Sequence, residues 1–389
     1  MTFAQLAVIC AVALLGPLLA VQRLARVPVV IGELAVGVAL GATGLQVLDS
    51  ANATFAFLAQ VGFALVMFVA GSHVPVREPA LRAGAVRGVA RAVGIGVLSV
   101  PVAFVLAHVF GTGHTALYAV LLASSSASLI MPALSGVPLS GPAIIEMLPQ
   151  IALADAACIV LLPLVIDPAH VVRAALGAAL VIATGAAIFL LLRTLERRGI
   201  RRHVHDVSEE NGLAVELRST LTLLFGLAAV ATLMHVSIML AGFALGLAYA
   251  AVGEPRRLTK QVFALTEGLF APIFFVWLGS SLNLRQLAQD PSAIGLGLAL
   301  GLGAAVVHGA MVLTRQPWPI ALVTSAQLGV PVAAATLGST LDVLAPGENS
   351  AIVLGALVTI GLTAALSRPI GRYALTAAQP PAPPPARSG

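Results

Sequence analysis

The sequence predicts an all-α polytopic membrane protein with about 13 transmembrane helices. Of its 389 residues, 59% are hydrophobic and only 10% are charged, whereas about 25% of residues are charged in a typical soluble protein. The mean hydropathy is +1.01. Apolar runs long enough to cross a bilayer recur along the whole chain. Lipid is therefore the main solvent of this protein.

The elements are expected to be helices, because only helices and closed barrels satisfy the backbone in lipid and the runs are too long and continuous for barrel strands. The first run has no basic residue before it, so we interpret it as a membrane helix and not as a cleaved signal peptide. The predicted spans are 4–21, 28–48, 52–71, 84–109, 114–133, 142–166, 170–192, 214–234, 236–252, 261–281, 292–314, 317–338 and 349–369.

Basic residues identify the side of the membrane on which each loop lies. They cluster after odd-numbered spans: Arg23, Arg26, Arg77, Arg82, Arg87, Arg91, Arg193, Arg197, Arg198, Arg201, Arg202, Arg256, Arg257, Lys260, Arg315, Arg368 and Arg372. The exception is the uncharged "SGVPLSG" after the fifth span. Because cytoplasmic loops are rich in Lys and Arg, we expect the N-terminus outside and the C-terminus inside a cytoplasmic (inner) membrane.

A polar linker at 193–213 divides the chain near its middle. It separates a first membrane repeat with its linker helix (1–192) from a second repeat (214–372), and a Pro-rich tail (373–389) is expected to be disordered. Six spans precede the seventh and six follow it, so the two sets have opposite orientations. This arrangement predicts an inverted-topology repeat.

The fifth and twelfth spans, which correspond under this repeat, both contain polar or helix-breaking residues. The fifth has Ser124, Ser125, Ser126 and Ser128 before Pro132, and the twelfth has Ser325, Gln327, Gly329 and Pro331. Interrupted helices at matching positions indicate the central site of a transporter. The alternative is that the serines bond to their own helix and each proline makes a harmless kink.

Asp155 is a single carboxylate in the apolar stretch "QIALADAACIVLLPLV" of the sixth span. An ionisable group at this depth costs free energy, so a functional role is the first hypothesis for Asp155. A carboxylate can hold either a proton or a small hard cation, but not both at once. The simplest alternative is a structural acid bonded to a neighbouring helix.

Other titratable residues lie in or near the spans. His308, at mid-depth in the eleventh span, could pair with Asp155 or share its proton, or could be a neutral histidine bonded to a carbonyl. Glu33 is a second buried acid and a secondary candidate. For Glu33, His73, Glu146 and Glu267 a structural role is favoured.

Several local patterns resemble a known family. They are "RVPVVIGELAVGVALGATGL", "VGFALVMFVAGSHV", "LLASSSASLIMPAL" and "FAPIFFVWLGSSLNL", in an order that runs through about residues 5–370. Their order is similar to that in the second family of monovalent cation:proton antiporters, which includes the Kef-type and Nha-type exchangers of sodium or potassium for protons.

The resemblance implies a dimer-forming scaffold and a mobile core in which two broken helices cross. Asp155 matches the ion-binding aspartate of the family, and Ser125 and Ser126 match the Thr-Ser of its first broken helix.

Three positions depart from the pattern: Ala154 stands where many members have a second acid or an Asn, His308 stands where many have a Lys, and Ser72 and His73 follow the Gly of the third span, where a Glu is usual. With Asp155 as the single carrier, one cation would exchange for one proton without net charge movement; if His308 also changes protonation in each cycle, the count would reach two protons.

The expected function is therefore exchange of Na+ or K+ for H+ by alternating access around Asp155, with Ser125, Ser126, His308 and Gln327 assisting. The lipid bilayer and a second copy of the chain are the expected partners. An enzyme is disfavoured, since no nucleophile, metal cluster or cofactor loop appears, and nucleic acid is not an expected partner. One alternative is an organic-solute transporter, which a wide apolar cavity would favour; another is a receptor or scaffold that has lost transport.

Overall fold

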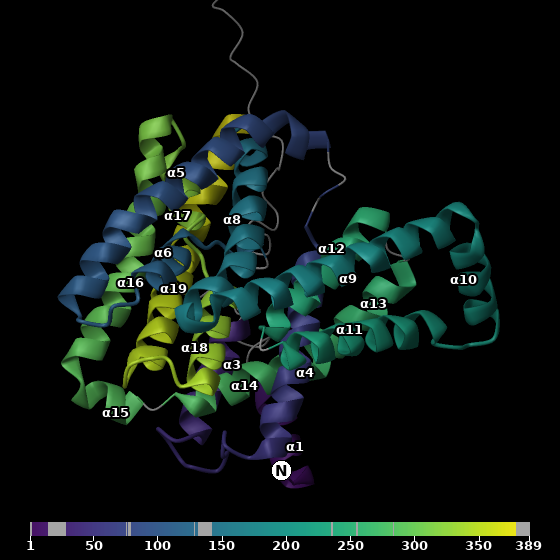
Figure 1. Ribbon diagram of the computed structural model, residues 1–389, viewed down its shortest axis with the longest axis horizontal. Coiled ribbons are helices and arrows are strands. Elements are labelled where there is room, and N and C mark those ends of the chain that lie inside the picture. Colours follow the sequence, from purple (N-terminus) through teal and green to yellow (C-terminus); the bar gives the residue numbers. More distant parts are fainter. Residues whose placement is uncertain are drawn as a thin grey trace, which may run out of the picture.

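The computed structural model describes residues 2–14, 29–74, 76, 79–127, 129–130, 142–234, 236–253, 256–282 and 284–378, and all regular structure over them is helical (Figure 1). The longer helices are α1 (Phe3–Ala13), α3 (Val29–Leu40), α4 (Ala53–Ser72), α5 (Pro79–Val109), α6 (Thr115–Ala123), α8 (Pro142–Ile166), α9 (Val171–Arg197), α10 (Ile200–Glu210), α11 (Val215–Leu233), α12 (Ile238–Val252), α13 (Arg256–Leu265), α14 (Ala271–Ser281), α16 (Pro291–Gly309), α18 (Gly329–Leu341) and α19 (Glu348–Ala378). The shorter elements are η1 (Pro168–His170), the π-helical η2 (Thr266–Phe270), α15 (Leu284–Gln289), η3 (Ala310–Thr314) and α17 (Trp318–Val323).

The all-helical membrane fold is confirmed, but the number of spans is not. Within the described ranges, eight helices are long and apolar enough to cross a membrane, and α12 and α18 are shorter apolar helices. The helices α1, α3 and α6 are shorter still. The count of thirteen therefore stays a prediction. The predicted linker contains the helix α10. Helix α19 continues into the predicted tail as far as Ala378, and residues 379–389 lie outside the described residues.

Two groups of packed helices surround the region described below. The core group comprises α5, α6, α8 and α16–α19: α5 packs on α6 and α8, and α16 on α19. The scaffold group comprises α3, α4, α12 and α14: α12 packs on α4, and α14 on α3 and α4. In Figure 1 the core helices α5, α6, α16 and α17 lie on the left, and α9 to α13 extend to the right.

The scaffold group is held together by close contacts at glycines. A Cβ added at Gly242 would lie 2.5 Å from the carbonyl oxygen of Ala64, and one at Gly246 would overlap the carbonyl oxygen of Phe68. Gly242 and Gly246 form a G-x-x-x-G spacing, which lets helix backbones approach in lipid.

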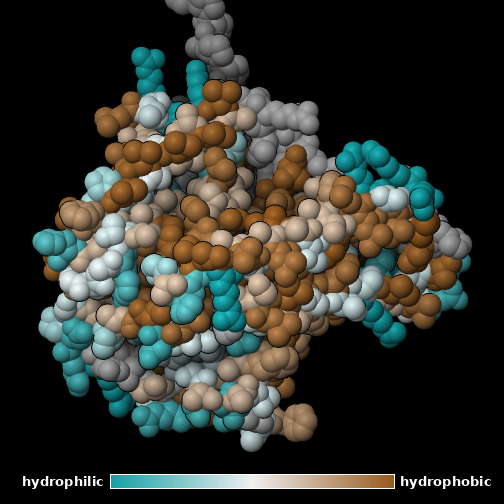
Figure 2. Space-filling model, viewed as in Figure 1, coloured by the Kyte–Doolittle hydropathy of each residue, from teal (hydrophilic) through white to brown (hydrophobic). Residues whose placement is uncertain are grey.

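Large apolar side chains cover much of the outer surface. Val97, Phe104, Leu176 and Leu191 are among those more than half exposed. Figure 2 shows that apolar residues occupy most of the visible face, whereas hydrophilic residues gather towards its margins. Apolar surface of this extent is expected to face lipid.

Candidate functional site

The first broken helix is α6, which ends in the middle of the predicted fifth span. Ser124 has an extended backbone (φ −69°, ψ 153°), and residues 124–126 are not helical. A new helical turn then begins, because the carbonyl of Ser126 accepts hydrogen bonds from the backbone N–H groups of Leu129 and Ile130. Ser128 and Pro132, singled out in the sequence, lie outside the described residues.

The second broken helix consists of α17 and α18, separated by residues 324–328. The predicted interruption is confirmed, but Gly329 and Pro331 lie in the first turn of α18, after the break. The Ser125 hydroxyl donates a 2.8 Å hydrogen bond to the carbonyl of Thr324. The two interruptions therefore meet in space; we call this place the crossing.

Asp155 lies at the crossing and is 7% exposed. Its Oδ2 is 3.4 Å from the backbone N–H of Ala127, in the first turn after the break in α6. The amino end of a helix favours a negative charge because its N–H groups point outward without partners. Ala154 precedes Asp155 on α8; it is buried and contributes no polar side-chain atom. No ion pair to Asp155 is found in the part of the chain that the structure describes.

His308 lies on a different side of the crossing. Its Nδ1 is 2.9 Å from Oγ1 of Thr324, and the ring is fully buried. Its Nε2 makes no well-directed hydrogen bond to a described residue, although the backbone of Leu122 and Ser124, at the carboxyl end of α6, lies beside the ring. Among the described contacts of His308, none joins it to Asp155, so the pairing considered from the sequence is not observed.

Sequence reasoning missed three polar residues here: Gln150, Gln316 and Thr324. The Nε2 of Gln316 donates to Oε1 of Gln150 at 2.9 Å, and the Nε2 of Gln150 donates to Oγ1 of Thr324 at 3.3 Å. All three side chains are at most 1% exposed. The available signal was a side-chain amide, Gln150, inside an apolar run, since polar groups at membrane depth need partners.

Several buried polar atoms around the crossing have no partner among the described residues. They are Nε2 of His308, Oε1 of Gln316 and Nε2 of Gln327. The backbone N–H of Gln327 is bonded to Thr359 on α19. A buried polar atom without a partner costs about 1–3 kcal/mol, so a polar group or ion that reached these atoms would lower that cost.

The other acidic candidates lie elsewhere. Glu33 is buried on α3, which packs on α14 and α1, and the acid that faces it is Glu267 of η2. The structure therefore does not bring Glu33 to the crossing. Glu146 accepts hydrogen bonds from Arg87 at 2.7 Å and Arg91 at 2.8 Å, and His73 is an exposed residue that caps α4.

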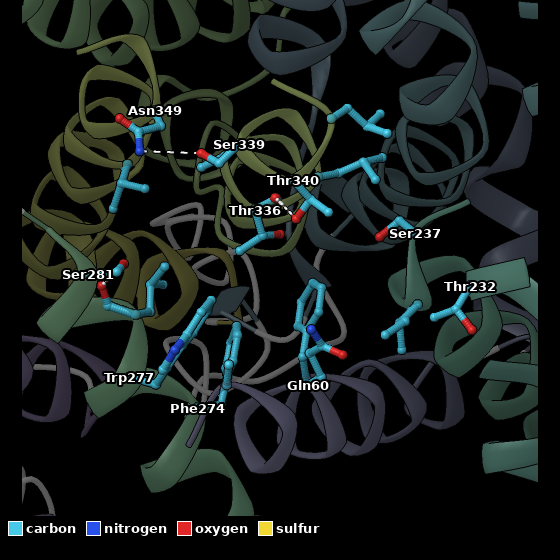
Figure 3. A pocket seen from close by; sticks show the side chains of 18 of the residues that line it. Gln60, Thr232, Ser237, Phe274, Trp277, Ser281, Thr336, Ser339, Thr340 and Asn349 are labelled. Atoms are coloured by element: carbon cyan, nitrogen blue, oxygen red, sulfur yellow. Dashed lines mark hydrogen bonds between the residues drawn. The ribbon is translucent and has the colours of Figure 1, made fainter. Parts of the chain in front are cut away.

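A cavity of about 630 Å³ separates the core helices α18 and α19 from the scaffold helices α4 and α14. Figure 3 shows Gln60, Phe274 and Trp277 along one wall and Thr336, Ser339, Thr340 and Asn349 along the opposite wall. None of the described residues that line it is charged, and none of the predicted site residues is among them. The cavity is bordered by the beginning of α4 and α19 and by the end of α14 and α18, so it lies towards one end of these helices.

Comparisons with known proteins agree with this architecture. The chain matches the family model described as "Sodium/hydrogen exchanger, transmembrane" over residues 10–370. It is 23% identical over 380 residues to "Putative Na(+)/H(+) antiporter YjbQ" of Bacillus subtilis (strain 168); the match covers 91% of this chain and 61% of that protein. The chain thus spans about three fifths of the length of this curated relative.

Two solved structures of the sodium proton antiporter MjNhaP1 from Methanocaldococcus jannaschii share the fold. The structure at pH 8 has 18% sequence identity and a TM-score of 0.63, with 97% of this chain and 98% of that chain covered. A structure from an electron-microscopy map has 17% identity and a TM-score of 0.65 over the same shares. At 17–18% sequence identity, this structural similarity shows that the two proteins share a fold.

Proposed function

The chain belongs to the sodium/hydrogen exchanger family, and from this premise we propose that it is a secondary antiporter that exchanges Na+ or K+ for H+ by alternating access around Asp155. The observation that carries the proposal is the buried Asp155 carboxylate at the crossing of two broken helices. Broken helices that meet at membrane depth are where transporters of this kind bind their ions.

One carboxylate can couple two ions because it binds them in competition. Asp155 holds either a proton or a monovalent cation. When it is empty and ionised, its buried charge is uncompensated and opposes movement through the membrane. Only the occupied core then moves between the two sides, and each cation that Asp155 carries one way is matched by a proton that Asp155 carries the other way.

The neighbouring polar groups would bind or position the ions. Ser125 and Ser126 lie in the first break and Gln327 in the second, beside half-helix ends whose backbone groups favour ions. The unpartnered Nε2 of His308 could take a proton, whereas the unpartnered Nε2 of Gln327 can only donate, so Gln327 would meet a cation through its amide oxygen. Asp155 would be the direct ligand of the cation, and His308 would take part on the proton side of the cycle.

The surroundings fit the same proposal. The core group would move against the scaffold group, and the cavity between α18, α19, α4 and α14 would be the entrance from outside. The N-terminus would lie outside and the C-terminus inside the cytoplasmic membrane, as the basic loops indicate. The repeats at 1–192 and 214–372, joined by 193–213, would form one protomer of a homodimer.

The cavity also favours a second candidate function, transport of an organic solute. Its volume of about 630 Å³ lies within the range of small-molecule sites. The described residues that line it offer aromatic rings and hydroxyl or amide groups but no charge. An organic solute would be carried on the same moving core, with Asp155 binding the coupling proton.

The test uses inside-out vesicles from a host that lacks its own antiporters. The vesicles are acidified, Na+, K+ or Li+ is added, and lumenal pH is followed for wild type, Asp155→Asn and the matched control Glu267→Gln. We expect a cation to dissipate the gradient in wild type and Glu267→Gln but not in Asp155→Asn. If no cation acts on folded, inserted wild type at acidic, neutral or alkaline pH, antiport of these ions is excluded and uncharged organic solutes are tested next.

A further inference from the structure

The hydroxyl of Thr324 lies at the centre of a set of buried hydrogen bonds. Its single proton is donated to the carbonyl of Ala321, 2.7 Å away. Its oxygen faces two nitrogens, Nε2 of Gln150 at 3.3 Å and Nδ1 of His308 at 2.9 Å. A hydroxyl has one donor and two acceptor positions. With the hydroxyl proton placed on the carbonyl of Ala321, which can only accept, Thr324 accepts from His308 and Nδ1 of His308 carries a hydrogen.

This assignment fixes the tautomer of a buried imidazole. A neutral imidazole has one N–H and one acceptor nitrogen. With the hydrogen on Nδ1, the Nε2 atom is the one that gains or loses a proton. Nε2 has no well-directed hydrogen bond and lies beside the backbone of Leu122 and Ser124. The carboxyl end of a helix favours a positive charge, so a proton bound at Nε2 would meet carbonyl oxygens.

Two glutamines hold Thr324 in this arrangement. Gln150 donates to Thr324 with its amide nitrogen, and its oxygen accepts from Gln316 at 2.9 Å. Gln150 is on α8, five positions before Asp155, so one helix contacts both broken helices. The backbone carbonyl of Thr324 is also tied to Ser125. Thr324 therefore cannot turn away from His308 without breaking several buried hydrogen bonds.

We propose that Thr324, held by Gln150 and Gln316, is the positioning residue that keeps His308 as the Nδ1–H tautomer and leaves Nε2 as its proton-exchanging atom. The inference rests on the proposed function for the role of His308 in transport, and it adds the residue and the atom that set that role. On binding, a proton adds to the Nε2 lone pair and the ring becomes a cation; on release, the same proton leaves and the Nδ1–H bond to Thr324 is unchanged.

Without the Thr324 oxygen the other tautomer is preferred. Its Nε2–H would donate to the carbonyls at the end of α6, and no lone pair would remain there to take a proton. Thr324→Val removes the oxygen at nearly constant volume, whereas Thr324→Ser keeps it. Thr324→Cys, with a weakly accepting sulfur, serves where the valine variant does not fold.

The first measurement is ¹⁵N NMR of the full-length protein with labelled histidine, with the signal of His308 identified by its absence in His308→Gln. We expect Nδ1–H in wild type and Thr324→Ser, and Nε2–H in Thr324→Val or Thr324→Cys. The second measurement is cation-dependent exchange against pH in vesicles. We expect about tenfold slower exchange in the valine variant, the lower end of the loss found when the hydrogen-bond partner of a metal-binding histidine is removed. We also expect a displaced pH profile in that variant, with wild-type behaviour restored by serine.

The proposal is overturned if Thr324→Val keeps Nδ1–H and the wild-type pH profile, or if Thr324→Ser behaves as the valine variant does. The spectra do not require transport. Wild-type protein that has the Nδ1–H tautomer but exchanges no cation would remove the proposed function and leave the positioning role intact. Wild-type protein that exchanges cations but has the Nε2–H tautomer would keep the proposed function and remove the positioning role.

Discussion

The scaffold group and the core group are both packed closely at glycines, but they differ in the polar groups that they bury. Helices meet at glycines such as Gly71 and Gly246 in the scaffold and Gly84 and Gly88 in the core, where a Cβ would overlap the neighbouring backbone. In the core, buried polar side chains gather at the crossing, and some of their atoms have no partner among the described residues. Close backbone packing resists deformation, whereas unpaired polar atoms favour a site that binds and releases a ligand.

The largest effect is expected where the scaffold leaves no room. Gly246→Leu places a side chain against the carbonyl of Phe68, which is backbone and cannot rotate away. Overpacking of this kind costs about 3 kcal/mol or more, so the variant should lose most of its folded population. Thermal unfolding in detergent measures this. Gly226→Leu on α11 is the control, since a Cβ there meets nothing within 4 Å; equal losses in both variants would contradict the comparison.

Within the core, the next largest effect is expected at Glu348, at the start of α19. Its carboxylate is 2% exposed and accepts hydrogen bonds from Tyr118 (2.7 Å) and the backbone of Ala345 (2.7 Å), with His114 Nδ1 at 2.8 Å. Glu348→Gln turns one acceptor into a donor that faces other donors, at a cost of about 2–3 kcal/mol.

Unfolding midpoints of Glu348→Gln and of Asp167→Asn measure this cost. The second variant breaks the ion pair of Asp167 with the mostly exposed His170, and such pairs contribute about 0–1 kcal/mol. A Glu348→Gln midpoint as close to wild type as that of Asp167→Asn would show that the buried cluster does not stabilise the core.

The same contrast explains what the sequence could and could not predict. The membrane-crossing helices, the two interruptions and the burial of Asp155 depend on local composition. They could therefore be predicted from the sequence alone. The break in the second interrupted helix lies before Gly329 and Pro331, because proline is well tolerated in the first turn of a helix and these residues begin α18.

The polar chain of the crossing could not be predicted in this way. Gln150 and Thr324 are 174 positions apart, and Gln150 and Gln316 are 166 apart. Nothing near either glutamine in the sequence indicates its partner. The orientation of His308 towards Thr324 and not towards Asp155 likewise depends on how α16 packs on α6 and α17.

A smaller effect is expected at the two arginines that share Glu146. Arg91 is 6% exposed and also bonds to the hydroxyl of Thr314 at 2.9 Å, whereas the side chain of Arg87 is 76% exposed. Arg91→Gln should cost about 2 kcal/mol, since hydrogen bonds to charged groups contribute about that much. Arg87→Gln should cost below about 0.5 kcal/mol. Unfolding midpoints of the two variants test this, and equal shifts would mean that burial does not distinguish them.

The smallest effect is expected at Glu33, and it bears most directly on the difference between the two groups. Glu33 and Asp155 are both buried acids, 4% and 7% exposed. Only Asp155 contacts a broken helix, through the N–H of Ala127, whereas Glu33 lies on α3, which packs against α14. If position at the crossing and not burial makes an acid an exchange site, Glu33→Gln should exchange cations at close to the wild-type rate while Asp155→Asn does not. Initial rates of cation-dependent pH recovery in vesicles with equal amounts of each protein measure this, and loss of exchange in Glu33→Gln at wild-type stability would extend the site into the scaffold.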